Sequence, residues 1–220
     1  MFQSQKHVFW EALLVTILIF GIGVFIGVVI ENWRTSRAGE LYQKSEVGLL
    51  DIRTQNEIYS LGEFNCDSAI EENLKFAGRI YEEAKILERY ETAERLTESL
   101  NLEHKKYDVL RALLWINSMK IKKQCNASYH NVVYLYDYIE PSIDIKAEQA
   151  VFSRILSELK DKKGNKIMLI PMAGDNNLSS INILIARYNV TEKELPVILI
   201  DEKIKITELQ KVEEIEKLIR

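Results

Sequence analysis

An uncharged apolar segment near the N-terminus constrains this chain more than any other feature. Residues 12–30 contain no charged side chain, and Leu, Ile, Val and Phe dominate them. A helix over these residues is about 28 Å long, close to the roughly 30 Å hydrocarbon core of a bilayer. A glutamate closes each end, and Trp10 and Trp33 stand where interfacial aromatic residues belong. We predict one transmembrane helix over residues 12–30, preceded by a short tail over residues 1–11.

A removed signal peptide is the main alternative for this segment. Signal peptides have an apolar core of about 7–15 residues, followed by small residues at the cleavage site. The apolar run here is longer, and residues 28–32 offer no such site, so we expect a retained signal-anchor. Gly23 and Gly27 form a GxxxG pair that would let two helices approach as a homodimer. Glycine is common in membrane helices, so an ordinary lipid-facing helix is the alternative.

Two patterns disagree about the side of the membrane that holds the rest of the chain. Lys6 precedes the apolar segment and three cations follow it, a bias that favours a cytoplasmic C-terminal region. These cations are Arg34, Arg37 and Lys44. Two cysteines suited to a disulfide and three N-x-Ser/Thr sequons favour the opposite, extracytoplasmic side. The sequons are the weaker evidence, because about one is expected by chance in a chain of this composition. The sequons are at Asn126, Asn177 and Asn189. We predict the extracytoplasmic side of the cytoplasmic membrane.

Composition excludes several classes of protein. Hydrophobic residues make up 47% of the chain and charged residues 28%, as in folded proteins rather than disordered ones. The net charge of −4 argues against a nucleic-acid partner, which favours a basic patch. The three histidines, His7, His104 and His130, lack the spacing of a metal site, so we predict no metal and no cofactor. Only nine Gly and three Pro interrupt the chain, which favours helix.

Residues 31–125 have the apolar spacing of helices. Steps of three and four residues predict a small helical bundle, and their irregularity disfavours the alternative of a partner-binding coiled coil. Ser68 and Glu71 have the form of a capping box at the start of the second helix. A third helix ends near Lys122 and Lys123, where cations suit a helix C-terminus.

The two cysteines fit this helical region. Cys66 stands just before the second predicted helix, and Cys125 stands just after the third. If the two helices are antiparallel neighbours, both thiols fall at the same end of the hairpin. A disulfide there would close a loop of about 60 residues and stabilise the fold by about 4 kcal/mol in the chain-entropy model. The alternative is two unrelated buried thiols.

Residues 126–220 alternate between strand and helix patterns. Apolar runs rich in β-branched residues occupy residues 132–136, 166–172, 196–201 and 204–206. Helical patterns lie between them at residues 147–162 and 180–188, and a last amphipathic helix is opened by Thr207 and Gln210. The order β-α-β-α-β-β-α predicts a central sheet covered on both faces, within an α+β or α/β fold.

This second half resembles a thioredoxin-like domain over about residues 131–220. Tyr188-Asn-Val-Thr191 leads into Leu195-Pro196-Val-Ile-Leu-Ile, as a "Y-x-V" turn leads to a cis-proline and a hairpin in that family. The whole layout is similar to membrane-anchored thioredoxin-like proteins of archaea. The resemblance implies that Pro196 follows a cis peptide bond and lies beside the active-site motif. Without the resemblance, Pro196 is simply the first residue of a strand.

The chain departs from that family at its reactive motif. Redox-active members carry C-x-x-C at the start of the helix after the first strand, and here Ile143 and Lys146 take those places. Thiol–disulfide exchange requires thiols, so the family's activity does not carry over. We therefore expect a redox-inactive, membrane-tethered module that binds a protein or peptide partner. The predicted contact residues are Ile143, Lys146, Leu195 and Pro196.

The sequence is also compatible with two other functions. Cys66 and Cys125 would serve an oxidoreductase if they cycled between thiol and disulfide while the second half positioned a substrate. The chain would instead be a structural subunit of a membrane complex if the helical region were its contact element.

Overall fold

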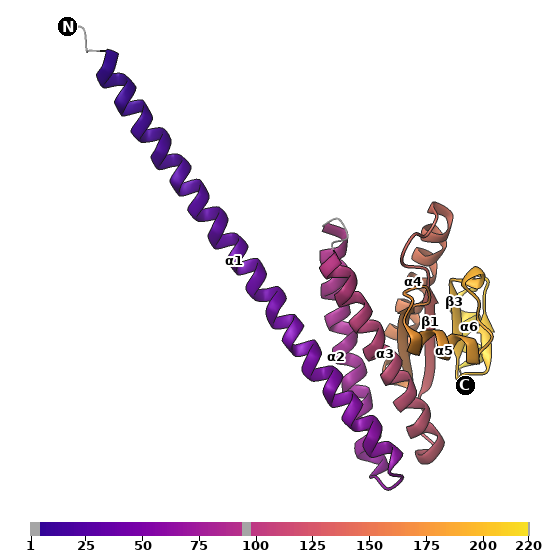
Figure 1. Ribbon diagram of the computed structural model, residues 1–220. Coiled ribbons are helices and arrows are strands. Elements are labelled where there is room, and N and C mark those ends of the chain that lie inside the picture. The colour runs from indigo at the N-terminus through magenta and orange to yellow at the C-terminus, as the bar shows by residue number, and fades with distance from the viewer. Residues whose placement is uncertain (1–4, 94–97, 220) are drawn as a thin grey trace. The chain divides into compact units, whose positions relative to one another are not determined.

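The computed structural model describes residues 5–93 and 98–219, and it describes the side chains of residues 8–30, 46–85 and 101–219 (Figure 1). The first four residues of the predicted tail therefore lie outside the described residues, as do the side chains of Arg34, Arg37 and Lys44. The chain divides into two compact units, Met1–Glu46 and Val47–Arg220. Together the described residues form a mixed α and β structure with one four-stranded sheet.

The first unit contains most of helix α1, which runs over Gln5–Ser60. Its segment Val8–Ile30 has a mean hydropathy of 3.0 and is long and apolar enough to cross a membrane. None of its most apolar window is buried inside the protein. The segment starts earlier than the predicted residue 12 because Val8, Phe9 and Trp10 are also apolar, and one carboxylate near the end of a span is tolerated.

The second unit opens with three helices: the end of α1, α2 (Cys66–Ala93) and α3 (Glu98–Cys125). In Figure 1, α2 and α3 run side by side. Ile52 of α1, Phe76 of α2 and Trp115 of α3 are buried in one apolar cluster. As predicted, α3 carries Lys122 and Lys123 in its last turn, where the helix dipole favours cations.

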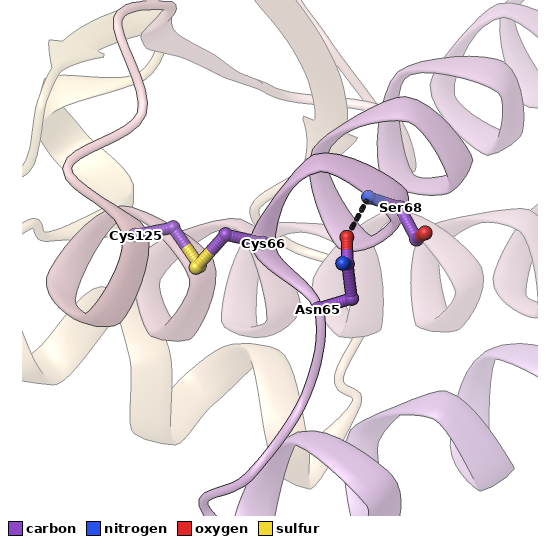
Figure 2. The surroundings of a disulfide bond; sticks show 4 residues. All are labelled: Asn65, Cys66, Ser68 and Cys125. Atoms are coloured by element: carbon purple, nitrogen blue, oxygen red, sulfur yellow. Dashed lines mark hydrogen bonds between the residues drawn. A yellow bond between two sulfur atoms is a disulfide. The ribbon is translucent and has the colours of Figure 1, made fainter.

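The predicted capping box at the start of α2 is wrong. The helix begins two residues earlier, at Cys66, so Ser68 lies in its first turn. Asn65 is the capping residue, because its Oδ1 accepts a hydrogen bond from the Ser68 amide at 2.9 Å (Figure 2). The predicted start of the last helix is also wrong, because a different residue caps that helix. Helix α6 (Val212–Leu218) opens where the Lys211 amide donates to the Glu214 carboxylate at 3.1 Å, not at residue 207.

The sheet has the order β2-β1-β3-β4. Strand β1 (His130–Tyr136) pairs in parallel with β2 (Ile167–Ala173), with Val132 beside Leu169. Strand β3 (Val197–Ile200) runs antiparallel to β1, and β4 (Ile204–Ile206) runs antiparallel to β3. Helix α4 (Ile143–Lys163) connects the two parallel strands, as such a crossover requires. The predicted order of strands and helices in this half is confirmed.

Helices cover both faces of the sheet. On one face, side chains such as Val132 and Tyr134 pack against α4 and α6. On the other face, Val133 and Leu135 share a core with α2, α3 and α5 (Ser179–Arg187). The helical hairpin and the sheet therefore share one core, and the predicted division between residues 125 and 126 runs through it.

A polar network fixes the β3–β4 turn against α3. Asp201 and Glu202 form the turn with φ angles of 49° and 59°, a left-handed conformation that residues other than glycine rarely adopt. Asp201 accepts hydrogen bonds from Lys122, His130 and the Asn131 amide. Glu202 accepts one from the Trp115 indole at 2.7 Å. These bonds offset the unfavourable backbone and tie the outer hairpin to the helical region.

Candidate functional site

The N-terminus of α4 is the first candidate site, because the predicted contact residues Ile143 and Lys146 lie there. Ser142 caps the helix, and its Oγ accepts a hydrogen bond from the Ile145 amide at 3.3 Å. This cap begins the helix at residue 143 rather than at the predicted residue 147. Ile143 is 85% exposed, and Lys146 is exposed on the same first turn. In the preceding loop Ile139 is 50% exposed. These residues form an apolar surface with a cation beside it, called here the α4 surface (Ile139, Ile143 and Lys146).

The other two predicted contact residues lie beneath the surface. The Leu195–Pro196 peptide bond is cis, as the resemblance implied. Both residues are buried, and Leu195 packs against the backbone of Gly174 at the end of β2. A Cβ atom at Gly174 would lie 2.9 Å from both methyl carbons of Leu195. Of the four predicted contact residues, only Ile143 and Lys146 present side chains to solvent.

A carboxylate pair stands beside this surface, at the carboxyl ends of β1 and β2. Asp175 accepts hydrogen bonds from the Tyr138 amide at 2.9 Å and the Ile139 amide at 2.6 Å, so it holds the loop that leads to α4. Burial, the hydrogen bond to Asp175, and the charges of Asp175 and Glu192 raise the pKa of Asp137 to about 6. Asp137 therefore loses its proton near pH 6.

The predicted disulfide is present between Cys66 and Cys125, with a Cα–Cα distance of 5.4 Å (Figure 2). It joins the start of α2 to the end of α3, because these helices are antiparallel neighbours. Cys125 packs against a small cluster that includes the buried Tyr59 and Ile121. The bridge thus closes the open end of the hairpin and lies outside the α4 surface.

The three asparagines of the predicted glycosylation sites share a backbone conformation. All are exposed, and each has a left-handed φ angle of about 50°. Asparagine tolerates this conformation better than most residues, so the local turns explain its presence. Glycosylation at these positions stays a prediction. The residues are Asn126 (49°), Asn177 (55°) and Asn189 (50°).

The remaining candidates are the two glycines of the GxxxG pair and the three histidines. Added Cβ atoms at Gly23 and Gly27 would meet no atom within 4 Å, and a homodimer through them stays a prediction. His104 Nε2 lies 2.8 Å from the Tyr136 hydroxyl, and His130 contacts Asp201. Among the described side chains, no group of three or more His, Cys, Asp or Glu is arranged to hold a metal ion. The side chain of His7 lies outside the described residues.

Sequence reasoning missed a second candidate site, a cavity of about 440 Å³ beside the outer edge of the sheet. Helices α2, α3 and α4 and strands β1 and β2 line it, so its walls come from distant parts of the chain. One local signal could have indicated it. Asp108 and Arg111 are buried polar residues of α3, and they interrupt the apolar stripe formed by Tyr107, Leu110 and Leu114.

Similarity to known proteins does not assign the chain to a family. It matches no protein-family model, and it has no significant match among the curated proteins or the solved structures.

Proposed function

We propose that this chain is a membrane-tethered, redox-inactive thioredoxin-like module that binds an extended segment of a protein partner. The strand order β2-β1-β3-β4, in which only β1 and β2 are parallel, supports the thioredoxin-like assignment. The distribution of α4 and α6 on one face and α5 on the other supports it too. The apolar segment Val8–Ile30 supports the tether.

The observation that carries the proposal is the absence of thiols at the start of α4. The resemblance implies that Ile143 and Lys146, in the first turn of α4, correspond to the two cysteines of a redox-active member of that family. The only two cysteines of the chain are joined to each other on α2 and α3. An exposed surface without a nucleophilic sulfur can bind a chain but has no group to exchange disulfides with it.

The chemistry of the α4 surface suggests its ligand. Ile139 and Ile143 are large apolar side chains exposed on one loop and helix start, an arrangement that favours contact with apolar side chains of a partner. Lys146 adds a cation for an acidic residue of the same segment. An extended peptide presents alternate side chains to such a surface, so an apolar–acidic pattern fits it best.

The disulfide supports an extracytoplasmic position for this surface. Disulfides persist in oxidising compartments and are rare in the cytosol of most organisms. The cations that follow α1's apolar segment favour the opposite orientation. We give the disulfide more weight, because the bridge closes a long loop of the folded unit.

Photo-crosslinking tests the proposed contact. A photoreactive residue at position 139 of the full chain, in its native membrane, should capture a protein partner. Ile143→Glu should lower the captured amount at least about fivefold, since it places a charge in an apolar contact. Ile183→Glu is the matched control, because Ile183 is 71% exposed on α5. Equal loss in both variants, or no loss in either, would remove the α4 surface from the proposal.

One observation favours a second candidate function, in which the bridge cycles between thiol and disulfide. Cys66 and Cys125 are only partly buried, so small reductants have some access to them. A catalytic bridge is labile, whereas a structural bridge resists the reducing strength of a glutathione pool. Equilibrating the folded chain with glutathione buffers separates the two. Reduction at cytosolic ratios of thiol to disulfide would favour the cycling function over the binding module.

A further inference from the structure

Strand β2 forms one outer edge of the sheet. Alternate residues of a strand direct their backbone N–H and C=O groups to opposite sides, so only every second residue of β2 faces β1. The Gly174 amide donates to the Tyr136 carbonyl at 2.8 Å, which places the even-numbered residues on the side of β1. The odd-numbered residues between 167 and 173 therefore direct their backbone groups outward, and such an edge is a template for another strand.

Side chains of this chain bind both ends of that edge. The Lys160 ammonium of α4 donates to the Ile167 carbonyl at 2.9 Å. At the other end, the Ala173 amide donates to the Asp108 carboxylate of α3 at 3.3 Å. Both bonds lie on the side away from β1, as the alternation requires. The ends of the edge are thus covered by the chain's own side chains, and its centre is left for a ligand.

The cavity of about 440 Å³ lies at the centre of this edge. Leu169 and Pro171 line it, and both are partly exposed. Tyr81 and Arg111, from the helices on one face of the sheet, form one wall, and Leu156 of α4 lies in the opposite wall. The cavity therefore straddles the strand, and these five residues define what we call the β2 edge groove.

Two backbone positions in the groove carry the groups that a strand would use. Leu169 directs both its N–H and its C=O outward, whereas Pro171 offers only its C=O because proline has no N–H. Proline within a sheet is confined to such an edge, where its missing donor breaks no bond to the neighbouring strand. The groove thus presents one donor and two acceptors with the spacing of an extended chain.

The side chains of the walls favour an uncharged ligand. Arg111 forms an ion pair with Asp108, and Lys85 forms one with Glu82 at 3.4 Å, so these charges offset each other. The Tyr134 hydroxyl donates to a backbone carbonyl of α4 at 3.4 Å. A charged ligand would lose hydration here without a matching partner charge. A ligand therefore gains most from the backbone groups of the edge and from apolar contact with the walls.

We propose that the β2 edge groove binds an extended, uncharged peptide segment of a partner protein, which adds to the sheet as a further strand. A carbonyl of the peptide accepts the Leu169 N–H, and its N–H groups donate to the Leu169 and Pro171 carbonyls. Its alternate side chains contact the two walls. Ile139, Ile143 and Lys146 do not line the groove, so the site is separate from the α4 surface and its test is independent.

Amide-resolved hydrogen exchange of the full chain in lipid nanodiscs tests the proposal. The probes are a pool of acetylated, amidated pentapeptides built from Val, Ile, Thr, Phe and Tyr. At least one peptide should slow exchange of the Leu169 amide by about tenfold or more at saturation, because it accepts that N–H. The Ile170 amide faces β1 and serves as the internal reference. Failure of every peptide at about 1 mM to protect Leu169 beyond Ile170 would overturn the proposal.

A matched pair of variants separates strand addition from ordinary side-chain contact. Leu169→Pro and Leu169→Ala both shorten the side chain, but only the proline removes the outward N–H, and it leaves the bonds to β1 intact. Leu169→Pro should weaken the best peptide at least about fivefold relative to Leu169→Ala. Equal affinity of the two variants would overturn strand addition.

Methylated peptides keep the proposal falsifiable if Leu169→Pro fails to fold, which circular dichroism would reveal. Two forms of the best peptide are compared on the wild-type chain, one N-methylated at its odd-numbered residues and the other at its even-numbered residues. Only one set of N–H groups faces β2 in an added strand, so one form should bind at least about tenfold more weakly than the other. Equal affinity of the two forms would overturn the proposal.

Discussion

Gly174 lets Leu195 pack closely against the end of β2. It continues the β1–β2 ladder, since its amide donates to the Tyr136 carbonyl at 2.8 Å. Leu195 fills the space where a side chain would be, with both methyl carbons 2.9 Å from an added Cβ atom. We predict that Gly174→Ala lowers the free energy of unfolding by about 1–3 kcal/mol, because the buried leucine must move. Denaturant unfolding of the full chain in detergent measures this loss.

Gly78→Ala is the matched control for that change. Gly78 is exposed within α2, and a Cβ atom there would meet no atom within 4 Å. Alanine is the better helix former, so this variant should be stabilised by about 0.5–1 kcal/mol. If Gly174→Ala were as stable as Gly78→Ala, the close packing of Leu195 on the β2 end would be disproved.

Asp137 makes stability depend on pH near neutrality. Its pKa is about 6 in the folded protein, and an unfolded aspartate titrates near its ordinary value of about 4. The folded state therefore binds more protons between these values, and the free energy of unfolding falls as pH rises through that window. Asp137→Asn should be more stable than wild type above pH 6 and equal to it near pH 4. The gain should stay below about 1 kcal/mol, because solvent screens the pair.

Thermal unfolding at several pH values checks this prediction. Asp161→Asn, an exposed position on α4, controls for the loss of one negative charge. A difference between Asp137→Asn and wild type that does not vary with pH would contradict the raised pKa of Asp137.

At the scale of elements, the disulfide stabilises the α2–α3 hairpin. Cys66 and Cys125 are 59 residues apart, so the bridge restricts a long loop in the unfolded chain. The double variant Cys66→Ser/Cys125→Ser should lose about 4 kcal/mol of stability in the chain-entropy model. Unfolding temperatures with and without reductant measure this loss in wild type, and the double variant should not respond to reductant. Equal stability of the variant and oxidised wild type would show that the bridge has no structural role.

The order of the elements could be predicted because each one has its own local pattern. The continuous apolar runs of β1 and β2 predict strands buried on both faces, and the structure covers both faces. Helix starts were less predictable. Ser68 and Glu71 match the pattern of a capping box, but α2 begins at Cys66. Asn65, the residue before it, therefore caps the helix. Local sequence gives several possible caps, and the path of the chain selects one.

Candidate site residues could be predicted from the sequence only where their position depends on a single local segment of the chain. The exposed Ile143 and Lys146 follow from their place at the start of α4. The burial of Leu195 depends on Gly174, a partner from another strand that the sequence does not indicate. The cavity draws its walls from Tyr81 of α2 to Pro171 of β2, so no local pattern contains it.

At the scale of the whole molecule, we expect the apolar segment Val8–Ile30 to tether the folded unit to a membrane. The full chain should stay in the membrane fraction after extraction with alkaline carbonate. Leu18→Arg/Ile22→Arg should release it, because each arginine at the centre of a span costs about 2.5–3.5 kcal/mol on the insertion scale. Leu61→Arg is the control, since Leu61 is 82% exposed and lies outside the apolar segment. Extraction of the unaltered chain by carbonate would contradict the membrane tether.

The shared core also belongs to this scale. Periodicity identifies the apolar faces of α2 and α3 but not the surface that each one covers. The structure packs Phe76 and Trp115 in the same cluster as Val133 of the sheet. The helical region is therefore a covering layer of the sheet, which no feature of either half alone indicates.

Insulin reduction by the full chain, with dithiothreitol as the electron donor, tests the central claim most directly. The Ile143→Cys/Lys146→Cys variant serves as the positive control, because it places a thiol pair at the start of α4. We predict that wild type reduces insulin no faster than dithiothreitol alone and that the variant reduces it faster. A wild-type rate clearly above that of dithiothreitol would contradict a redox-inactive binding module.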